Sequence, residues 1–184
     1  DASRLKLSAK GGLSAEFCFA RADSIRVRVR KGSLRLTLAG PRRGEYALPR
    51  GEGAWQVNCR RVAMHYLFTP LTGAMSVDSP WDGMSASDVV VELKPEGATP
   101  AEMAIEEFWS APPTLGHELP FGDCVASAKQ DFERFLDALP PAPDGFKTAR
   151  ELAAYVMWSC VVRPRGNFKR PAMLMSKNHM ANVW

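Results

Sequence analysis

The residues best suited to chemistry lie near the end of the chain, in the run Lys169–Trp184. A cation, an amide, an imidazole and an aromatic ring come together there: Lys177, Asn178, His179 and Trp184. This mixture suits a sugar, because hydroxyl groups need hydrogen-bond donors and acceptors, and the CH faces of a sugar favour aromatic rings. On composition alone, the same residues could equally form a capped helix start with one packed tryptophan. Both interpretations stay open at this point.

The two ends of the sequence favour a chain that is part of a longer protein. Termini are usually polar and poorly ordered. This chain instead stops on a partly apolar, aromatic run, and it begins with Asp1 rather than with methionine. We therefore expect a cut after Trp184, with an unfinished domain before it.

Composition indicates an ordinary globular protein. The chain has 184 residues, 46% of them hydrophobic and 24% charged, with a formal net charge of +4. This length allows one good core plus an appendage. No apolar run reaches about 18 residues, so we expect no membrane span. Without a P-loop, a GxGxxG motif or a Ser-His-Asp spacing, the sequence predicts neither nucleotide chemistry nor a nucleophilic triad.

The cysteines predict neither a metal site nor a redox motif. They are widely scattered and form no CxxC pair and no zinc-type cluster: Cys18, Cys59, Cys124 and Cys160. We interpret them as free, buried thiols in a reducing compartment, which predicts a cytoplasmic protein without metal or cofactor. Spacing alone does not settle whether any of them pair.

The elements that would position the terminal run begin with strands. Apolar and basic residues alternate without a break over Ser24–Arg30, and leucines continue the alternation over Leu34–Leu38 after the turn signal at Gly32. This pattern predicts a hairpin with one buried face. Further short runs, separated by Gly, Pro, Asp and Ser, cover 13–19, 54–58, 62–68, 73–77 and 89–93. Residues 1–113 are therefore predicted to form an antiparallel β-sandwich in a mainly β protein.

Helices follow the strands. An apolar stripe at helical spacing predicts one helix over 122–139, and the run Pro140–Gly145 must end it because consecutive prolines cannot continue a helix. We assign 114–146 to this linking helix and a Pro-rich hinge. A second helix is predicted over 148–162 with Thr148 as its cap, and 147–184 would begin a second, helical domain.

The charged residues look structural. The arginines of Ser24–Arg30 could attract nucleic acid, but no stacking aromatics alternate with them, so we favour a solvated sheet face or edge and expect no nucleic-acid partner. Glu102, Glu106 and Glu107 are interpreted as a solvent-exposed face, without a matched catalytic pair. His65 is expected to be a satisfied sheet histidine, and His117 lies in a Gly/Pro-rich loop.

The segment from Met157 to Trp184, with its run Arg-Pro-Ala-Met-Leu-Met-Ser-Lys-Asn, resembles bacterial amylo-α-1,6-glucosidase-like proteins. These are related to the mannosyl-oligosaccharide glucosidase and trehalase type of glycoside hydrolase. The resemblance implies that the sandwich precedes an (α/α)6 barrel, of which 147–184 would be the incomplete start. In the family this run leads into a Trp-Asp motif that helps to hold the sugar. It therefore places Lys177, Asn178, His179 and Trp184 near the sugar site.

The chain departs from the family pattern by ending at Trp184. The family's general acid and base lie farther on, so no catalytic residue is carried over to this chain. The resemblance implies an intact protein that hydrolyses α-glucosides or oligosaccharides with inversion, and a segment that is not itself catalytic. The rest of the barrel would come from the same or another chain. Self-association is expected, because the helix over 148–162 would expose Leu152, Tyr155 and Val156.

A second class of function competes with this one. The sandwich could be a stand-alone, non-catalytic carbohydrate-binding module, with Trp55, Trp81 or Trp109 stacked on sugar rings. Tryptophans of this kind are more often part of a core. The two readings differ in whether these rings are exposed and whether the chain continues into a barrel.

Overall fold

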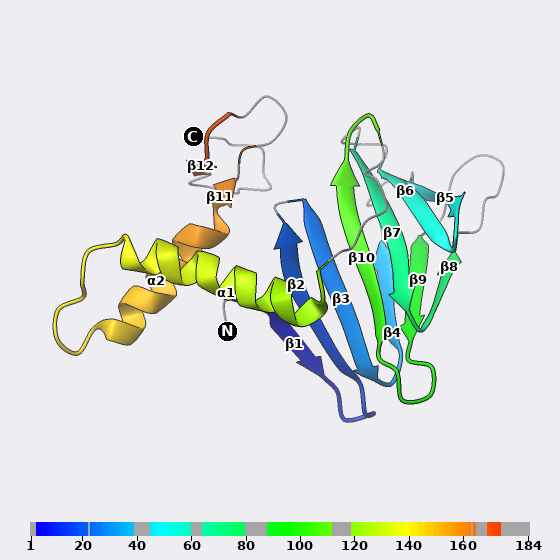
Figure 1. Ribbon diagram of the computed structural model, residues 1–184, viewed down its shortest axis with the longest axis horizontal. Coiled ribbons are helices and arrows are strands. Elements are labelled where there is room, and N and C mark those ends of the chain that lie inside the picture. Colours follow the sequence, from blue (N-terminus) through cyan, green and yellow to red (C-terminus); the bar gives the residue numbers. More distant parts are fainter. Residues whose placement is uncertain are drawn as a thin grey trace. The chain divides into compact units, whose positions relative to one another are not determined.

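The structure is a computed structural model that describes residues 3–21, 23–38, 45–59, 64–79, 88–111, 119–162, 164 and 169–173 (Figure 1). The chain divides into two compact units, Ser3–Ala126 and Ser127–Trp184. The three-part division proposed from the sequence stays a prediction. Neither helix in the described part of the chain combines the length and the apolar character that a membrane span needs.

The first unit is a β-sandwich, as the sequence predicted. One sheet has seven strands in the order β1-β2-β3-β10-β7-β6-β5, and the other has three in the order β4-β9-β8, all paired antiparallel (Figure 1). The strands are β1 (Leu5–Ser8), β2 (Ser14–Arg21), β3 (Ser24–Lys31), β4 (Leu34–Leu38), β5 (Glu45–Gly51), β6 (Ala54–Cys59), β7 (Met64–Thr72), β8 (Ala74–Asp78), β9 (Val89–Lys94) and β10 (Ala101–Phe108).

The core lies between the two sheets and follows from the alternation of each strand. Val27 and Val29 of β3, Phe68 of β7, Val91 of β9 and Met103 of β10 are all essentially inaccessible to solvent. Since successive side chains of a strand point to opposite faces, the same strands place their other residues on the face away from this core. We call this second face of the seven-stranded sheet the outer face.

The predicted hairpin over 24–38 is wrong in its pairing. Both strands form, but β4 pairs with β9 in the other sheet, with Leu34 opposite Leu93. The neighbours of β3 are β2 and β10. The turn at Gly32 therefore carries the chain from one sheet to the other. Alternation predicts a strand and its buried face, but it does not tell pairing from a crossing between sheets.

A second correction concerns the carboxylates of β10. The sequence analysis interpreted Glu102 and Glu106 as a solvent-exposed face. They belong instead to a strand paired on both sides, with β3 and with β7, and Glu106 is almost fully buried. The apolar residues between them, such as Met103 and Ile105, alternate as a half-buried strand requires. That pattern was present in the sequence.

Helix α1 (Phe121–Asp137) begins in the first unit and continues into the second, where α2 (Lys147–Ser159) follows. Phe132 of α1 meets Trp158 and Tyr155 of α2 edge-on, with ring centroids 5.5 and 6.3 Å apart. Two short strands complete the described part of this unit, β11 (Val161–Val162) and β12 (Ala172–Met173).

Helix α2 ends earlier than predicted, because residues 161 and 162 belong to β11. It also begins at Lys147 without a side-chain cap, so the prediction that Thr148 caps it is wrong.

Arg150 of α2 closes the Pro-rich connection. Its guanidinium donates hydrogen bonds to the carbonyl oxygens of Leu136, Leu139 and Pro140 at 2.6, 2.9 and 2.7 Å. The last carbonyls of a helix have no partner within it, and a cation is favoured at that end. Arg150 thus supplies hydrogen-bond donors to carbonyl oxygens at and just after the end of α1.

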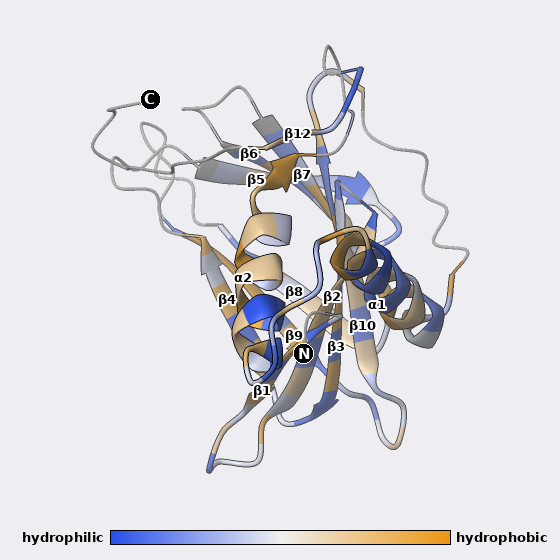
Figure 2. Cartoon of the chain, turned by 90° about the vertical axis from the view of Figure 1, so that its left-hand side faces the viewer, coloured by the Kyte–Doolittle hydropathy of each residue, from blue (hydrophilic) through white to orange (hydrophobic). Residues whose placement is uncertain are grey.

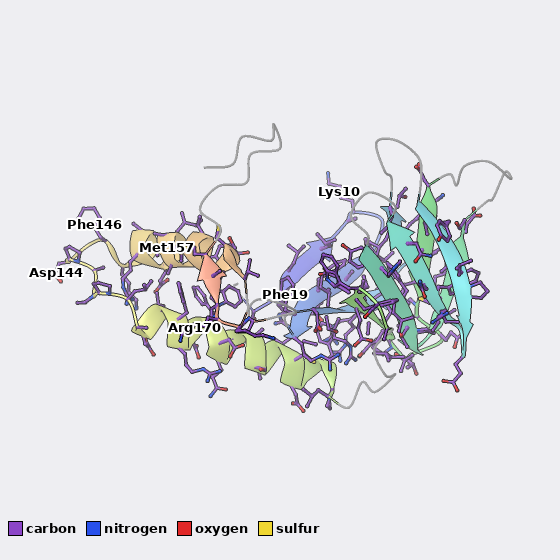
Figure 3. All side chains as sticks on the ribbon, turned by 90° about the horizontal axis from the view of Figure 1, so that it is seen from above. Lys10, Phe19, Asp144, Phe146, Met157 and Arg170 are labelled. Carbon is purple, nitrogen blue, oxygen red and sulfur yellow. The ribbon has the colours of Figure 1, made fainter. Side chains whose placement is uncertain are left out.

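Helix α2 also carries apolar side chains that face solvent. Most of it lies on the hydrophobic side of the scale in Figure 2, and Figure 3 shows Phe146 pointing away from the start of the helix. Leu152, Tyr155 and Val156, which share one stripe at helical spacing, are 64, 45 and 55% exposed. Ala154, on the other side, is fully buried.

The turn between β7 and β8 predicts a sharp sensitivity at Gly73. Its φ is +73°, and a Cβ there would lie 2.6 Å from Ala101 Cβ and 2.7 Å from Lys94 O. We expect Gly73→Ala to lower the free energy of unfolding by about 3 kcal/mol, from backbone strain plus overpacking. Urea denaturation measures this. The control is Gly122→Ala in α1, where a Cβ meets open space. Equal effects of the two substitutions would contradict the prediction.

Candidate functional site

The terminal residues singled out in the sequence lie outside the described residues. Lys177, Asn178, His179 and Trp184 therefore keep their role near a sugar as a prediction. The polar chemistry that the structure does describe is on the outer face of the seven-stranded sheet. It falls into two parts, one over β1, β2, β3 and β10 and one over β10, β7, β6 and β5.

The first part is a set of carboxylates held by arginines. Glu102 of β10 lies opposite β3 and accepts hydrogen bonds from Arg26 Nη2 at 2.8 Å and from Arg28 Nε at 2.7 Å. Glu16 of β2 is bound in the same way by Arg4 and Arg30, at 2.7 and 2.8 Å. We call these six residues, together with the pair below, the carboxylate–arginine ladder.

The third carboxylate of the ladder is Glu106. Arg21 Nη2 lies 2.6 Å from Glu106 Oε1, and the Glu106 side chain is 2% exposed. The sequence showed the arginines of β3 as an isolated basic stripe because their partners are far away in the chain. Their charge is largely matched within the sheet. The predicted solvated face or edge is wrong for Arg26, which is 4% exposed in a strand that is paired on both sides.

The environments of Glu16 and Glu106 shift their pKa values in opposite directions. Burial works against ionisation of Glu16, but the hydrogen bond and charge of Arg30 and the charges of Arg4 and Arg28 outweigh it and lower the pKa. For Glu106, burial dominates and raises the pKa, although the charge of Arg21 and its hydrogen bond oppose it. Each carboxylate is engaged by at least one arginine, so the ladder does not form a free acid and base pair.

The ladder also fixes the beginning of α1. Arg26 Nη1 donates to Leu119 O at 2.9 Å, and the Arg28 guanidinium lies 4.2 Å from the centre of the Phe121 ring. Phe121 packs with Cys18 of β2 and Cys124, both of them free thiols. Burial, with a smaller effect of Cys124, raises the pKa of Cys18 to about 12. A thiol in this state is a poor nucleophile, and we assign it to packing.

The second part of the outer face is a row of four residues from four strands. The register sets Tyr46 of β5 opposite Asn58 of β6, Asn58 opposite His65 of β7, and His65 opposite Phe108 of β10. The His65 and Phe108 ring centroids are 5.3 Å apart. We call these four residues the β5–β10 row. His65 therefore lies in a sheet, as the sequence predicted.

Asn58 is the centre of this row. Its Oδ1 accepts hydrogen bonds from Gln56 Nε2 at 2.7 Å and from His65 Nδ1. Asn58 is 4% exposed, yet no group among the described residues accepts a hydrogen bond from its Nδ2. Thr69 Oγ1 of β7, on the same face, is likewise buried without a described partner. Unpaired buried polar atoms are uncommon and each costs about 1–3 kcal/mol.

The tryptophans named as candidates from the sequence differ in their exposure to solvent. Trp55 packs against the sandwich core, whereas Trp109, directly after β10, is 60% exposed. Trp81 and His117 lie outside the described residues. Across the described ranges, no three His, Cys, Asp or Glu side chains are grouped so as to hold a metal ion. The arrangement is suited to binding a polar ligand through donors, acceptors and rings.

Comparison with known proteins supports the fold. No family model matches the chain, and no curated protein matches its sequence. Among solved structures, the chain is similar to the GH92 family glycosyl hydrolase CcMan5, with a TM-score of 0.53 and 15% identity. The match covers 92% of this chain and 28% of that chain. The fold of this chain is similar to the matched part of that structure. The more specific likeness to amylo-α-1,6-glucosidases is not part of this finding.

The lowered pKa of Glu16 predicts a pH-dependent contribution to stability. At pH 7 we expect Glu16→Gln to reduce the free energy of unfolding by about 2 kcal/mol, because two arginines lose a charged acceptor. Because the pKa of Glu16 is lower in the folded chain than in the unfolded chain, ionised Glu16 stabilises the fold at pH values above the usual pKa of 4.5. This stabilisation is lost as the pH falls through the pKa of Glu16 in the folded chain. The gap between the variant and the parent chain should therefore close in acid, as measured by urea denaturation across pH 3–7.

The matched control for this experiment is Glu133→Gln on α1. Glu133 makes an exposed ion pair with Lys129 at 3.6 Å, so its removal should change stability little at any pH. A deficit of Glu16→Gln that is the same at pH 3 and pH 7 would show that the charge of Glu16 is not its cause.

Proposed function

We propose that this chain is the sandwich-containing segment of a glycoside hydrolase that acts on α-glucosides or oligosaccharides. The intact protein would hydrolyse its substrate with inversion, and the segment itself would not be catalytic. The observation that carries the proposal is the fold likeness to a glycosyl hydrolase over 92% of this chain. The second support is the terminal run Lys169–Trp184, which resembles amylo-α-1,6-glucosidase-like proteins.

In this proposal, α2 is the first helix of an (α/α)6 barrel, and the rest of the barrel comes from the same or another chain. Two features of the described residues support it. Helix α2 contacts Phe132 of α1 through Trp158 and Tyr155. Leu152 and Val156 remain largely exposed, as does about half of Tyr155. The described helices are also too few to enclose a core of their own. The proposal also includes a cytoplasmic location, because Cys18, Cys124 and Cys160 are free thiols.

The sugar site of the intact protein would include Lys177, Asn178, His179 and Trp184. Extension of the reading frame beyond the codon for Trp184 is the first test, because a barrel needs several further helices. Hydrolysis of a panel of α-glucosides by the longer protein is the second. Proton NMR of the anomeric signal of the first product then reports inversion or retention.

The role proposed for His179 gives a direct prediction. In the longer protein, His179→Ala should lower kcat/KM by at least about 100-fold, because a donor or acceptor to the sugar is lost in the transition state. His117→Ala, which removes a histidine outside the run Lys169–Trp184, is the control and should leave kcat/KM within about twofold. Equal activity of the two variants would remove His179 from the site.

The exposed stripe of α2 predicts self-association of the 184-residue chain by itself. An exposed stripe of apolar side chains favours association between chains, because association removes the apolar surface from water. We expect sedimentation velocity to show a concentration-dependent dimer or larger species. Leu152→Gln combined with Val156→Gln should weaken the association constant at least about tenfold, since two large side chains lose their burial. Met157→Gln, off the stripe, is the control. A chain that stays monomeric at high concentration would contradict the prediction.

The alternative function is a stand-alone carbohydrate-binding sandwich, and the exposure of Trp109 favours it. In that case malto-oligosaccharides should change tryptophan fluorescence in a saturable way, and Trp109→Ala should abolish the change. A stop codon directly after Trp184 would favour this alternative over the glycosidase segment.

A further inference from the structure

The β5–β10 row has no role in the sandwich core. Its four residues come from four strands, and the register of these strands brings them to one level. All four lie on the outer face, opposite the side that packs against the three-stranded sheet. Phe108 packs with Ala54 and Leu67 on this face. Packing between the two sheets does not explain why a tyrosine, an asparagine and a histidine are aligned beside it.

The hydrogen bonds of the row hold its polar groups in one arrangement. Asn58 Oδ1 can only accept, so the bond from His65 places a proton on His65 Nδ1. In neutral His65, Nε2 is then an acceptor in a fixed position. Asn58 Oδ1 also accepts a hydrogen bond from Gln56 Nε2. In this orientation of the amide, Asn58 Nδ2 is buried and has no acceptor among the described residues.

These groups define the ligand that would complement them. It must donate a hydrogen bond to His65 Nε2 and present CH groups to the Tyr46 ring. A saccharide does both, because its hydroxyls donate hydrogen bonds and its ring carries CH faces. An ionised carboxylate offers acceptors only and could not bond neutral His65 Nε2. Arg21, which meets Glu106 of β10 on this face, is already paired.

We propose that the β5–β10 row is a saccharide-binding surface on the sandwich, separate from the terminal run Lys169–Trp184. The choice of a saccharide rests in part on the proposed function. Tyr46 and His65 are half-buried and would contact the sugar directly, whereas Asn58 and Phe108 are buried and would support them from below. Leu48 of β5, beside Tyr46 on the same face, is 44% exposed and extends the apolar part of the surface.

The test is an NMR titration of the histidine ring signals of the 184-residue chain with maltotriose. His65 is assigned by comparison with His65→Gln. We expect the His65 signals to shift with saturation below about 10 mM, while the signals of His117 and His179 respond differently or not at all. Tyr46→Ala should weaken binding at least about tenfold. The matched control, Tyr155→Ala, removes an exposed tyrosine from α2 and should leave the titration unchanged.

Three outcomes would overturn the proposal. The first is that the His65 signals show no saturable shift, and the second is that Tyr155→Ala weakens binding as much as Tyr46→Ala does. The third is a shift with inorganic phosphate but not with maltotriose. Circular dichroism of both tyrosine variants confirms that each is folded. The proposed glycosidase function is read separately, from hydrolysis by the longer protein. Hydrolysis by the longer protein without a saturable shift of the His65 signals would contradict only the saccharide-binding surface. A saturable shift without hydrolysis would contradict only the glycosidase function.

Discussion

The insertion of β10 between β3 and β7 is the constraint on which the rest of the sandwich depends. It joins β1-β2-β3 to β5-β6-β7, two groups of strands that are each contiguous in sequence. On the core side, Met103 packs beside Val27. On the outer face, Glu102 receives both Arg26 and Arg28, across 76 and 74 residues of sequence. Removal of the Glu102 carboxylate would leave the buried guanidinium of Arg26 without its charged partner. The loss of one partner costs more stability than the replacement of both by apolar residues.

The same interaction reaches beyond the sheet. Arg26 and Arg28, oriented by Glu102, contact Leu119 and Phe121, where α1 begins. A single carboxylate thus connects the pairing of β3 with β10 to the position at which the chain leaves the sheet. At the other end of α1, Arg150 performs a comparable task with three backbone carbonyls. Both ends of this helix are therefore held by arginine side chains rather than by apolar packing alone.

Sequence reasoning recovered the parts of the fold that depend on local pattern. The alternation in β3, β6 and β9 and the helical spacing in α1 gave these elements nearly their observed bounds. The partners of β3 and β4 were not recoverable, because pairing depends on contacts that the alternation of one strand does not encode. The carboxylate–arginine ladder was missed for the same reason. The signal for β10 was present in Ala101–Phe108 but was outweighed by its three glutamates.

The candidate site was less predictable than the fold. A row that forms by register across four strands has no sequence motif, since Tyr46 and Phe108 are 62 positions apart by their numbers. Single residues gave partial signals. His65 was expected in a sheet, and Trp109 was named among the exposed candidates. The interaction that makes His65 a fixed acceptor, its bond to Asn58, follows only from the pairing of β6 with β7.

The late position of β10 in the chain has a consequence for synthesis. During translation, β1-β2-β3 and β5-β6-β7 leave the ribosome before the strand that joins them, so the edges of β3 and β7 are open during that interval. An open edge is a template for pairing with another nascent chain. Arg26 and Arg28 of β3 have no Glu102 to bind during this interval, and repulsion between these unpaired charges opposes the pairing of two such edges. The charges that later form the ladder thus first protect the unfinished sheet.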